Sequence, residues 1–76
     1  MSRVVLYTSP GCHLCEQARA ILDREHVEYA EVDITGDPRL EADYREWLPV
    51  VEIDGKRAFV YRIPVEALRR KLTAQS

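Results

Sequence analysis

Cysteine and glycine are scarce in this sequence, and no hydrophobic run is long. The 76 residues include two cysteines and three glycines, while 46% of the residues are apolar. Small secreted domains of this size usually depend on several disulfides. A single Cys12–Cys15 bridge would close a very short ring and contribute only about 2 kcal/mol. The cysteines therefore do not serve as staples, and we expect residues 1–76 to fold as one domain around an apolar core.

Other absences concern location and partners. No stretch approaches the roughly 20 apolar residues of a membrane span, and the apolar run Val4–Tyr7 is too short for a signal peptide. We therefore expect a cytoplasmic protein without membrane contacts, whose thiols are kept reduced. Basic and acidic residues number 11 and 13, for a net charge of −2. This balance predicts that the protein does not bind nucleic acid.

The spacing of apolar residues changes along the chain and predicts strands and helices in alternation. Strands are expected at Arg3–Thr8, Val27–Ile34, Pro49–Ile53 and Arg57–Tyr61, and helices at His13–Glu25, at Pro38–Trp47 and from Pro64 onward. The first strand is apolar at successive positions, so we expect it to be buried on both faces. The second alternates imperfectly, which a bulge or cover on both faces would explain. Leu40, Tyr44 and Trp47 predict one apolar stripe on the second helix.

The order of these elements predicts the topology. A strand, a helix and a second strand in succession imply a parallel crossover. Asp54-Gly55 between two apolar runs implies an antiparallel hairpin. The order β-α-β-α-β-β-α therefore predicts an α/β domain with a four-stranded mixed sheet and helices on both faces. This is the arrangement of the minimal thioredoxin fold.

Cys12 and Cys15 lie where the first strand pattern gives way to the first helix. The N-terminus of a helix stabilises a thiolate, which is the reactive form of cysteine. Thiol–disulfide exchange needs one accessible thiolate that attacks and a second thiol that releases the mixed disulfide. We therefore expect Cys12 to be the catalytic nucleophile and Cys15, one turn into the helix, to be the more buried resolving cysteine.

A metal site is the main alternative for two cysteines at this spacing. Structural zinc takes four ligands, usually as two pairs, and this chain offers His13 and His26 but no second Cys-x-x-Cys. His26 lies near the far end of the first helix, about 20 Å from the cysteines at roughly 1.5 Å per residue. An intrachain metal site is therefore not expected, although a site shared between two chains stays open. His13 could favour the Cys12 thiolate or be a polar residue on an exposed loop.

Two segments resemble glutaredoxins. The opening of a glutaredoxin is similar to residues 5–15, Val-Leu-Tyr-Thr-Ser-Pro-Gly-Cys-His-Leu-Cys, and residues 48–55 resemble the segment in which a proline precedes the third strand. The likeness is greatest to small bacterial glutaredoxin-like domains. In that family the proline is cis, faces the cysteines, and follows a residue whose backbone pairs with the substrate. The resemblance therefore implies a cis Leu48–Pro49 bond, and we expect Leu48, Pro49 and His13 to bind substrate.

The turn that holds glutathione in glutaredoxins has a different sequence here. After the fourth strand the family has Gly-Gly-x-Asp, whereas residues 62–66 of this chain are Arg-Ile-Pro-Val-Glu. His13 and Leu14 replace the usual proline and tyrosine between the cysteines, and Ser9 stands where many members carry a basic residue. The resemblance thus implies the fold and the dithiol chemistry, but not glutathione as a dedicated partner.

These observations together predict a thiol–disulfide oxidoreductase that reduces protein disulfides or uses low-molecular-weight thiol substrates. We expect a monomer that needs no cofactor and no metal. An external reductant, either a reductase or glutathione, is expected to return the cysteine pair to the dithiol after each cycle. Two other interpretations stay open. One is a metal or iron–sulfur binding module, and the other is a non-catalytic binding domain that keeps the fold.

Overall fold

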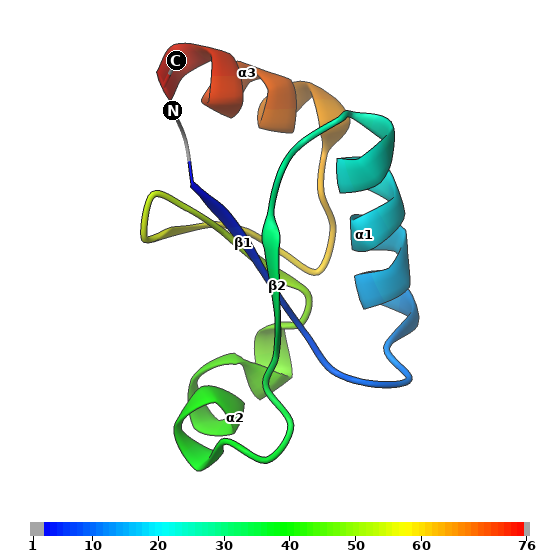
Figure 1. The fold of residues 1–76 in the computed structure, drawn as a ribbon, viewed down its shortest axis with the longest axis vertical. Helices are drawn as coiled ribbons and strands as arrows, with labels where there is room; N and C mark the ends of the chain where they lie inside the picture. The colour runs from blue at the N-terminus through cyan, green and yellow to red at the C-terminus, as the bar shows by residue number, and fades with distance from the viewer. Residues whose placement is uncertain (1–2, 76) are drawn as a thin grey trace.

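The computed structural model describes residues 3–75, with side chains from Arg3 to Thr73. Its elements, in chain order, are β1 (Val4–Thr8), α1 (His13–Arg24), β2 (Ala30–Asp33), α2 (Pro38–Tyr44), a 3₁₀ turn (Arg45–Trp47), β3 (Val50–Ile53), β4 (Lys56–Val60) and α3 (Val65–Gln75). The predicted order of strands and helices is confirmed (Figure 1). Within this range no helix is long and apolar enough to cross a membrane.

The four strands form one mixed sheet in the order β2-β1-β3-β4. β1 runs parallel to β2 and antiparallel to β3, and β3 pairs antiparallel with β4. Asp54 and Gly55 between β3 and β4 both have left-handed backbones, at φ 54° and 82°, as a two-residue type I′ hairpin requires. The parallel crossover and the Asp-Gly hairpin are thereby confirmed, and the topology is that of the minimal thioredoxin fold.

The two faces of the sheet are covered to different extents. α1 and α3 cover one face, and the core lies between these helices and the sheet (Figure 1). This core consists of Val4, Leu6, Ala18, Leu22, Val51, Ile53, Ile63 and Leu68. Alternate residues of a strand point to opposite faces, and Val5 and Tyr7 on the other face of β1 are only half-buried. The prediction that the first strand is buried on both faces is therefore wrong.

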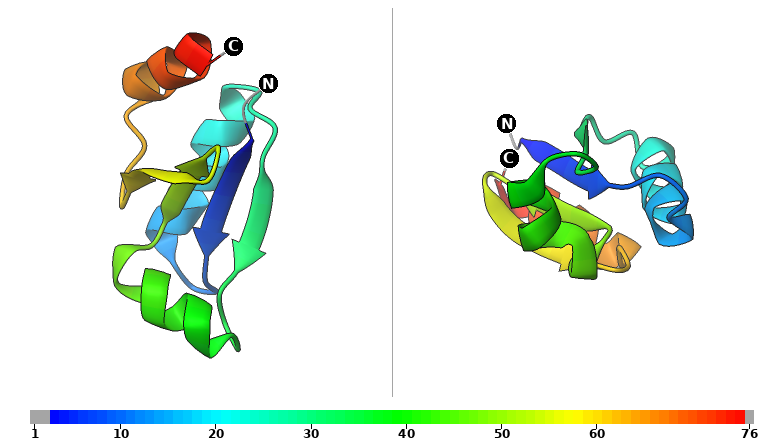
Figure 2. Two further views of the ribbon diagram at one scale, coloured as in Figure 1. Left: turned by 90° about the vertical axis from the view of Figure 1, so that its left-hand side faces the viewer. Right: turned by 90° about the horizontal axis from the view of Figure 1, so that it is seen from below.

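α2 contacts this second face at the carboxyl end of β1. The ring of Tyr44 stacks on that of Tyr7, with 4.1 Å between the ring centroids and 10° between the ring planes. The hydroxyls of Tyr7 and Tyr44 both donate to the carboxylate of Glu52, at 3.3 and 2.6 Å. The left-hand view of Figure 2 shows α2 at the end of the sheet, with no helix over the rest of this face. Helices thus lie on both faces, as predicted, but the second face is covered only at one end.

β2 is shorter than the predicted strand Val27–Ile34. It comprises Ala30–Asp33, lies at the edge of the sheet, and is mostly exposed. Its ladder with β1 is regular, so neither a bulge nor cover on both faces accounts for the imperfect alternation. Val27 and Tyr29 pack against the core from the connection that precedes the strand. This explains why they are out of phase with Val32, which belongs to the strand itself.

α2 begins as predicted but ends differently. The carboxylate of Asp37 accepts hydrogen bonds from two backbone N–H groups of the first turn, and Pro38 occupies the first helical position. The α-helix ends at Tyr44 and continues as a 3₁₀ turn, which has three residues per turn instead of 3.6. Trp47 is therefore displaced from the stripe that Leu40 and Tyr44 begin, and its side chain is 41% exposed.

Candidate active site

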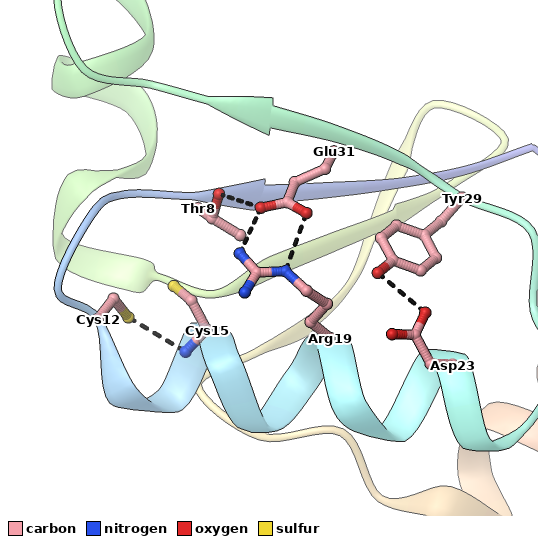
Figure 3. Close-up of polar contacts among 7 residues, drawn as sticks. All are labelled: Thr8, Cys12, Cys15, Arg19, Asp23, Tyr29 and Glu31. Carbon is pink, nitrogen blue, oxygen red and sulfur yellow. Dashed lines mark hydrogen bonds and ion pairs between the residues drawn. The ribbon is translucent and has the colours of Figure 1, made fainter.

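Cys12 caps the N-terminus of α1. Its backbone is extended (φ −89°, ψ 108°), and its Sγ accepts a hydrogen bond from the backbone N–H of Cys15 at 3.2 Å (Figure 3). The sulfur takes the place of the side-chain oxygen that usually satisfies a free N–H group at the start of a helix. A negative charge on this sulfur would be stabilised both by the hydrogen bond and by the helix dipole.

The two cysteines are free thiols that differ in exposure. Cys12 is half-buried, whereas Cys15 is 1% exposed. Burial raises the pKa of the Cys15 thiol to about 12, and its interaction with Cys12 adds to the increase. Cys15 is therefore a protonated thiol at neutral pH, and of the two sulfurs that of Cys12 is the more accessible to solvent.

A polar network missed by the sequence analysis lies next to Cys15 (Figure 3). Arg19, one helical turn after Cys15, donates through Nε and Nη2 to the two carboxylate oxygens of Glu31. Thr8 is 3% exposed, and its hydroxyl donates to the same carboxylate at 3.1 Å. The hydrogen bonds from Arg19 lower the pKa of Glu31. The positive charge of Arg19 also lowers the pKa of Cys15, although burial outweighs it.

The Leu48–Pro49 peptide bond is cis, which confirms the isomer that the resemblance to glutaredoxins implies. The Pro49 side chain is fully buried, and Leu48 is half-buried, just before β3. The carbonyl of Pro49 accepts a hydrogen bond from the backbone N–H of Tyr61 at 3.0 Å. This bond joins the loop before β3 to the end of β4. The binding of substrate by Leu48 and Pro49 stays a prediction.

His13 is the first residue of α1, and its side chain is 92% exposed. Its charged neighbour is Glu16, with 3.7 Å between His13 Nδ1 and the Oε2 of Glu16. The imidazole therefore lies in solvent at the start of the helix, and its contact with substrate stays a prediction. Among the described residues, no three His, Cys, Asp or Glu side chains converge on a position where they could hold a metal ion.

Two aromatic residues beside the cis proline were not predicted as part of the site. Trp47 and Tyr61 are the exposed large hydrophobic residues between positions 3 and 73, at 41% and 44%. Their ring centroids lie 6.0 Å apart, with 41° between the ring planes. Tyr61 has a φ of +68°, in a region that costs a non-glycine residue on the order of 1–3 kcal/mol. No sequence signal marked either residue, because both lie in patterns that are typical of ordinary strands and helices.

A cavity of about 310 Å³ lies between α1 and the segment after β4. It is lined by Leu14 and Gln17 of α1 and by Tyr61 and Arg62. Because Leu14 stands between the two cysteines, the cavity is directly beside the Cys-x-x-Cys motif. Arg62 is exposed and forms no ion pair with any described residue. A larger hollow of about 470 Å³ lies along α3 and contains neither cysteine.

The fold and the site together define the class of this protein. A sheet in the order β2-β1-β3-β4, a Cys-x-x-Cys motif at the start of α1 and a cis proline before β3 indicate a glutaredoxin-like protein of the thioredoxin fold. Residues 3–73 match the family described as Glutaredoxin-like domain (DUF836), and the chain belongs to this family. The resemblance carried by residues 5–15 and 48–55 is thereby confirmed.

Solved structures and curated relatives agree with this assignment. The fold is similar to that of a Northeast Structural Genomics target protein from X. campestris, with a TM-score of 0.82 and 30% identity over 93% of this chain and 96% of that one. The Global transcriptional regulator Spx 1 of Bacillus cereus is 37% identical over 49 residues, which are 64% of this chain and 37% of the relative. A glutaredoxin of Pseudomonas aeruginosa is 37% identical over 43 residues, 57% of this chain and 51% of the relative. The chain thus spans about half or less of the length of these curated relatives.

Proposed function

We propose that this chain is a dithiol–disulfide oxidoreductase that acts as a disulfide reductase. The observation that carries the proposal is the asymmetry of the cysteine pair. Cys12 lies at the helix start with its sulfur hydrogen-bonded to the amide of Cys15, which is itself buried one turn further on. Thiol–disulfide exchange uses this asymmetry, because the substrate disulfide must reach one sulfur, and the other sulfur attacks only after the mixed disulfide has formed. Membership of the glutaredoxin-like family supports the same chemistry.

The reaction has two steps. In the first, the Cys12 thiolate attacks one sulfur of the substrate disulfide, a Cys12–substrate disulfide forms, and the departing thiolate takes up a proton. In the second, Cys15 loses its proton to solvent and attacks the Sγ of Cys12, and the second substrate sulfur leaves as a thiol. Two electrons have then passed from the dithiol to the substrate, and a Cys12–Cys15 disulfide remains.

The environment of Cys15 fits the second step. Burial is the main cause of its raised pKa, and Cys12 adds to it through a hydrogen bond and through its charge. Once Cys12 is held in a mixed disulfide, its negative charge is gone, while the positive charge of Arg19 still favours the Cys15 thiolate. Cys15 therefore stays protonated in the resting dithiol and becomes easier to deprotonate when its attack is needed.

We assign substrate contacts to Leu48, Pro49 and His13. Leu48 has an extended backbone (φ −64°, ψ 142°) that suits pairing with an extended substrate segment. The substrate is a protein disulfide or a low-molecular-weight disulfide, and a reductase or glutathione returns the Cys12–Cys15 disulfide to the dithiol. We expect the protein to work as a monomer in the cytoplasm. Thiols are kept reduced there, so the reaction runs in the direction of substrate reduction.

The variant Cys15→Ser tests the order of the steps. It keeps the attacking thiol but lacks the resolving one, so it should accumulate one mixed disulfide per chain at Cys12 when mixed with excess 2-hydroxyethyl disulfide. Intact-mass and peptide-mapping spectrometry measure this adduct. The matched variant Cys12→Ser should form an adduct about 100-fold more slowly, because its remaining thiol is buried. Equal adduct formation on the two variants would contradict the roles assigned here.

The wild-type protein tests the function itself. Under a graded dithiothreitol potential, a Cys12–Cys15 disulfide should form and be reduced reversibly. Mass spectrometry detects its formation as the loss of two hydrogens from the chain. A protein that never forms this disulfide would point to the non-catalytic alternative. A chain that carries zinc or an iron–sulfur absorbance after purification would point to the metal-binding alternative.

A further inference from the structure

Tyr61 has a strained backbone conformation for a residue with a bulky side chain. Within residues 3–75, three residues other than glycine have a positive φ: His26, Asp54 and Tyr61. His26 ends α1 and Asp54 lies in a type I′ hairpin, where left-handed residues are required. Tyr61 follows β4 directly, at the centre of a three-residue γ-turn in which the N–H of Arg62 donates to the carbonyl of Val60 at 2.7 Å. A γ-turn with a positive central φ is rare and strained. For a bulky side chain a positive φ is a genuine outlier, and such outliers cluster at functional sites.

Three contacts hold Tyr61 in this conformation. Its backbone N–H donates to the carbonyl of Pro49 at 3.0 Å, and its phenol hydroxyl donates to the carbonyl of Glu46 at 3.1 Å. Its ring lies beside that of Trp47. All three partners belong to residues 46–49, the segment that leads through the cis bond into β3. The strained backbone therefore fixes the tyrosine ring next to the loop that faces substrate in the proposed function.

Trp47 and Tyr61 together present an aromatic pair to solvent. Each side chain is more than two-fifths exposed, although both rings are held by contacts with neighbouring groups. Rigid tyrosine and tryptophan rings lose little conformational freedom on binding and dominate the energetics of protein interfaces. A pair of them beside a reactive cysteine indicates a ligand that has apolar surface of its own.

The cavity beside these two rings favours a ligand that carries a negative charge. It reaches from Leu14 of the Cys-x-x-Cys motif to Tyr61 and Arg62, and its volume of about 310 Å³ lies at the lower end of the range for ligand pockets. The guanidinium of Arg62 forms no ion pair in the described part of the chain. A carboxylate on the ligand would complement this charge through charge-assisted hydrogen bonds.

We propose that Trp47, Tyr61 and Arg62 select polypeptide disulfides in which an aromatic and an acidic residue lie close to the reactive cysteine. The proposal rests on the proposed function, since the polypeptide is the disulfide that Cys12 attacks and that receives the two electrons. An extended polypeptide can supply an apolar side chain for the rings and a carboxylate for Arg62. Glutathione supplies carboxylates but has no apolar side chain that would cover two aromatic rings.

Two synthetic peptides test the selection. Each carries one cysteine in a mixed disulfide with 5-thio-2-nitrobenzoate; one has phenylalanine and aspartate near that cysteine, and the other has alanine and lysine at the same positions. Attack of Cys12 on the peptide sulfur releases the coloured thiol, and Cys15 then releases the peptide thiol. We expect the wild-type dithiol to react about tenfold faster with the phenylalanine–aspartate peptide than with the other.

Each variant is measured with both peptides and compared by the ratio of the two rates, so that a change in its overall reactivity cancels. Tyr61→Gly adopts the same φ without strain and, like Trp47→Ala, should bring the ratio down to about 2 or less. Tyr61→Phe keeps the ring and should keep the ratio close to that of the wild type. Arg62→Glu should also lower the ratio, because its carboxylate repels the aspartate of one peptide and attracts the lysine of the other, whereas Arg70→Glu, a matched charge change at an exposed position on α3, should leave the ratio unchanged.

Each outcome decides one proposal. A wild-type ratio near 1, or a ratio that persists in both Tyr61→Gly and Trp47→Ala, would overturn the selection by the aromatic pair and leave the redox function standing. A wild-type protein that releases no coloured thiol from either peptide would overturn the redox function and this inference with it. A dimer that forms with rising concentration and is lost in Trp47→Ala would assign the pair to a second copy of the chain instead of a peptide.

Discussion

Each end of α1 lies next to a residue other than glycine whose φ is positive. Only at the carboxyl end does the helix itself explain this conformation. At the carboxyl end, His26 has a φ of 57°, and the N–H groups of His26 and Val27 donate to the carbonyls of Asp23 and Leu22. This is a Schellman motif, in which a left-handed residue satisfies the last carbonyls of a helix. Beside the amino end, Tyr61 has a φ of 68° and is held by residues distant in sequence.

The difference separates a structural end of the molecule from a reactive one. The His26 conformation completes hydrogen bonds that every helix end needs. The end with Cys12 instead has a reachable sulfur, two exposed aromatic rings and an Arg62 that forms no ion pair in the described part of the chain. Proteins accept such local conflicts mainly at functional sites. We therefore expect changes at the carboxyl end of α1 to alter stability and changes at its amino end to alter reactivity.

The largest expected effect is the contrast between the two thiols at the reactive end. At pH 7 iodoacetamide should modify Cys12 about 100-fold faster than Cys15, because Cys15 is 1% exposed and its pKa is raised to about 12 by burial. Timed quenching and peptide mapping measure the two rates, and unfolding in urea should make them similar. Slow modification of both thiols in the folded protein would remove the distinction drawn between nucleophile and resolving cysteine.

A smaller effect links Cys15 to stability in alkali. Its thiol pKa is about 12 in the folded protein, against an ordinary value of 9.0. Between these values the unfolded chain binds fewer protons than the folded one, so the free energy of unfolding falls as pH rises, by at most about 1.4 kcal/mol per pH unit. Urea denaturation between pH 9 and 11 should show a shallower decline for Cys15→Ala than for wild type. Equal slopes would show that burial does not perturb this thiol.

At the structural end, His26→Gly should raise the free energy of unfolding by about 0.5–1 kcal/mol. The left-handed conformation costs an L-residue roughly 1–2 kcal/mol, and glycine loses about 0.5–1 kcal/mol of that gain through the extra freedom of the unfolded chain. Chemical denaturation measures the change, with His26→Ala as a control that should not gain. Rates of disulfide reduction should stay as in wild type. A large loss of activity would place function at both ends of the helix.

The smallest expected effect concerns an ion pair near His26. Both carboxylate oxygens of Glu25 accept hydrogen bonds from Arg69 of α3, and these bonds hold the pKa of Glu25 below its ordinary value. The pair therefore contributes stability above that ordinary range and loses it as pH falls. Because the guanidinium is largely exposed, the contribution is small. Glu25→Gln should flatten the decline of stability in acid slightly, and Glu28→Gln, at an exposed neighbouring position, should not.

Local chemistry predicted most of the fold. The Asp54-Gly55 pair strongly favours a type I′ turn and so predicted the hairpin between β3 and β4. Asp37 supplies the cap of α2 and Pro38 its first residue. The cis Leu48–Pro49 bond could be anticipated only from the resemblance to glutaredoxins, because the residues around a proline do not by themselves select the cis isomer. The positions of the two cysteines followed from the change of period between β1 and α1.

Contacts between distant segments could not be predicted in the same way. Arg19 meets Glu31 only because α1 packs over the edge of the sheet where β2 lies, and nothing in one sequence shows which surface charges will pair. Tyr29 was placed in the predicted strand because it is aromatic, but it packs against the core from the connection before β2. The same limit applies to Tyr61, because its strained turn is held in part by hydrogen bonds to Glu46 and Pro49, which are distant in sequence.

Trp47 is the one tryptophan of the chain, and its position has a practical consequence. The indole is partly in water, beside Tyr61 and one residue from the cis bond. The emission of an indole depends on the water and the groups around it, so a single fluorophore stands where substrate is expected to arrive. The protein therefore carries its own optical reporter, and events at this loop can be followed in real time without a label.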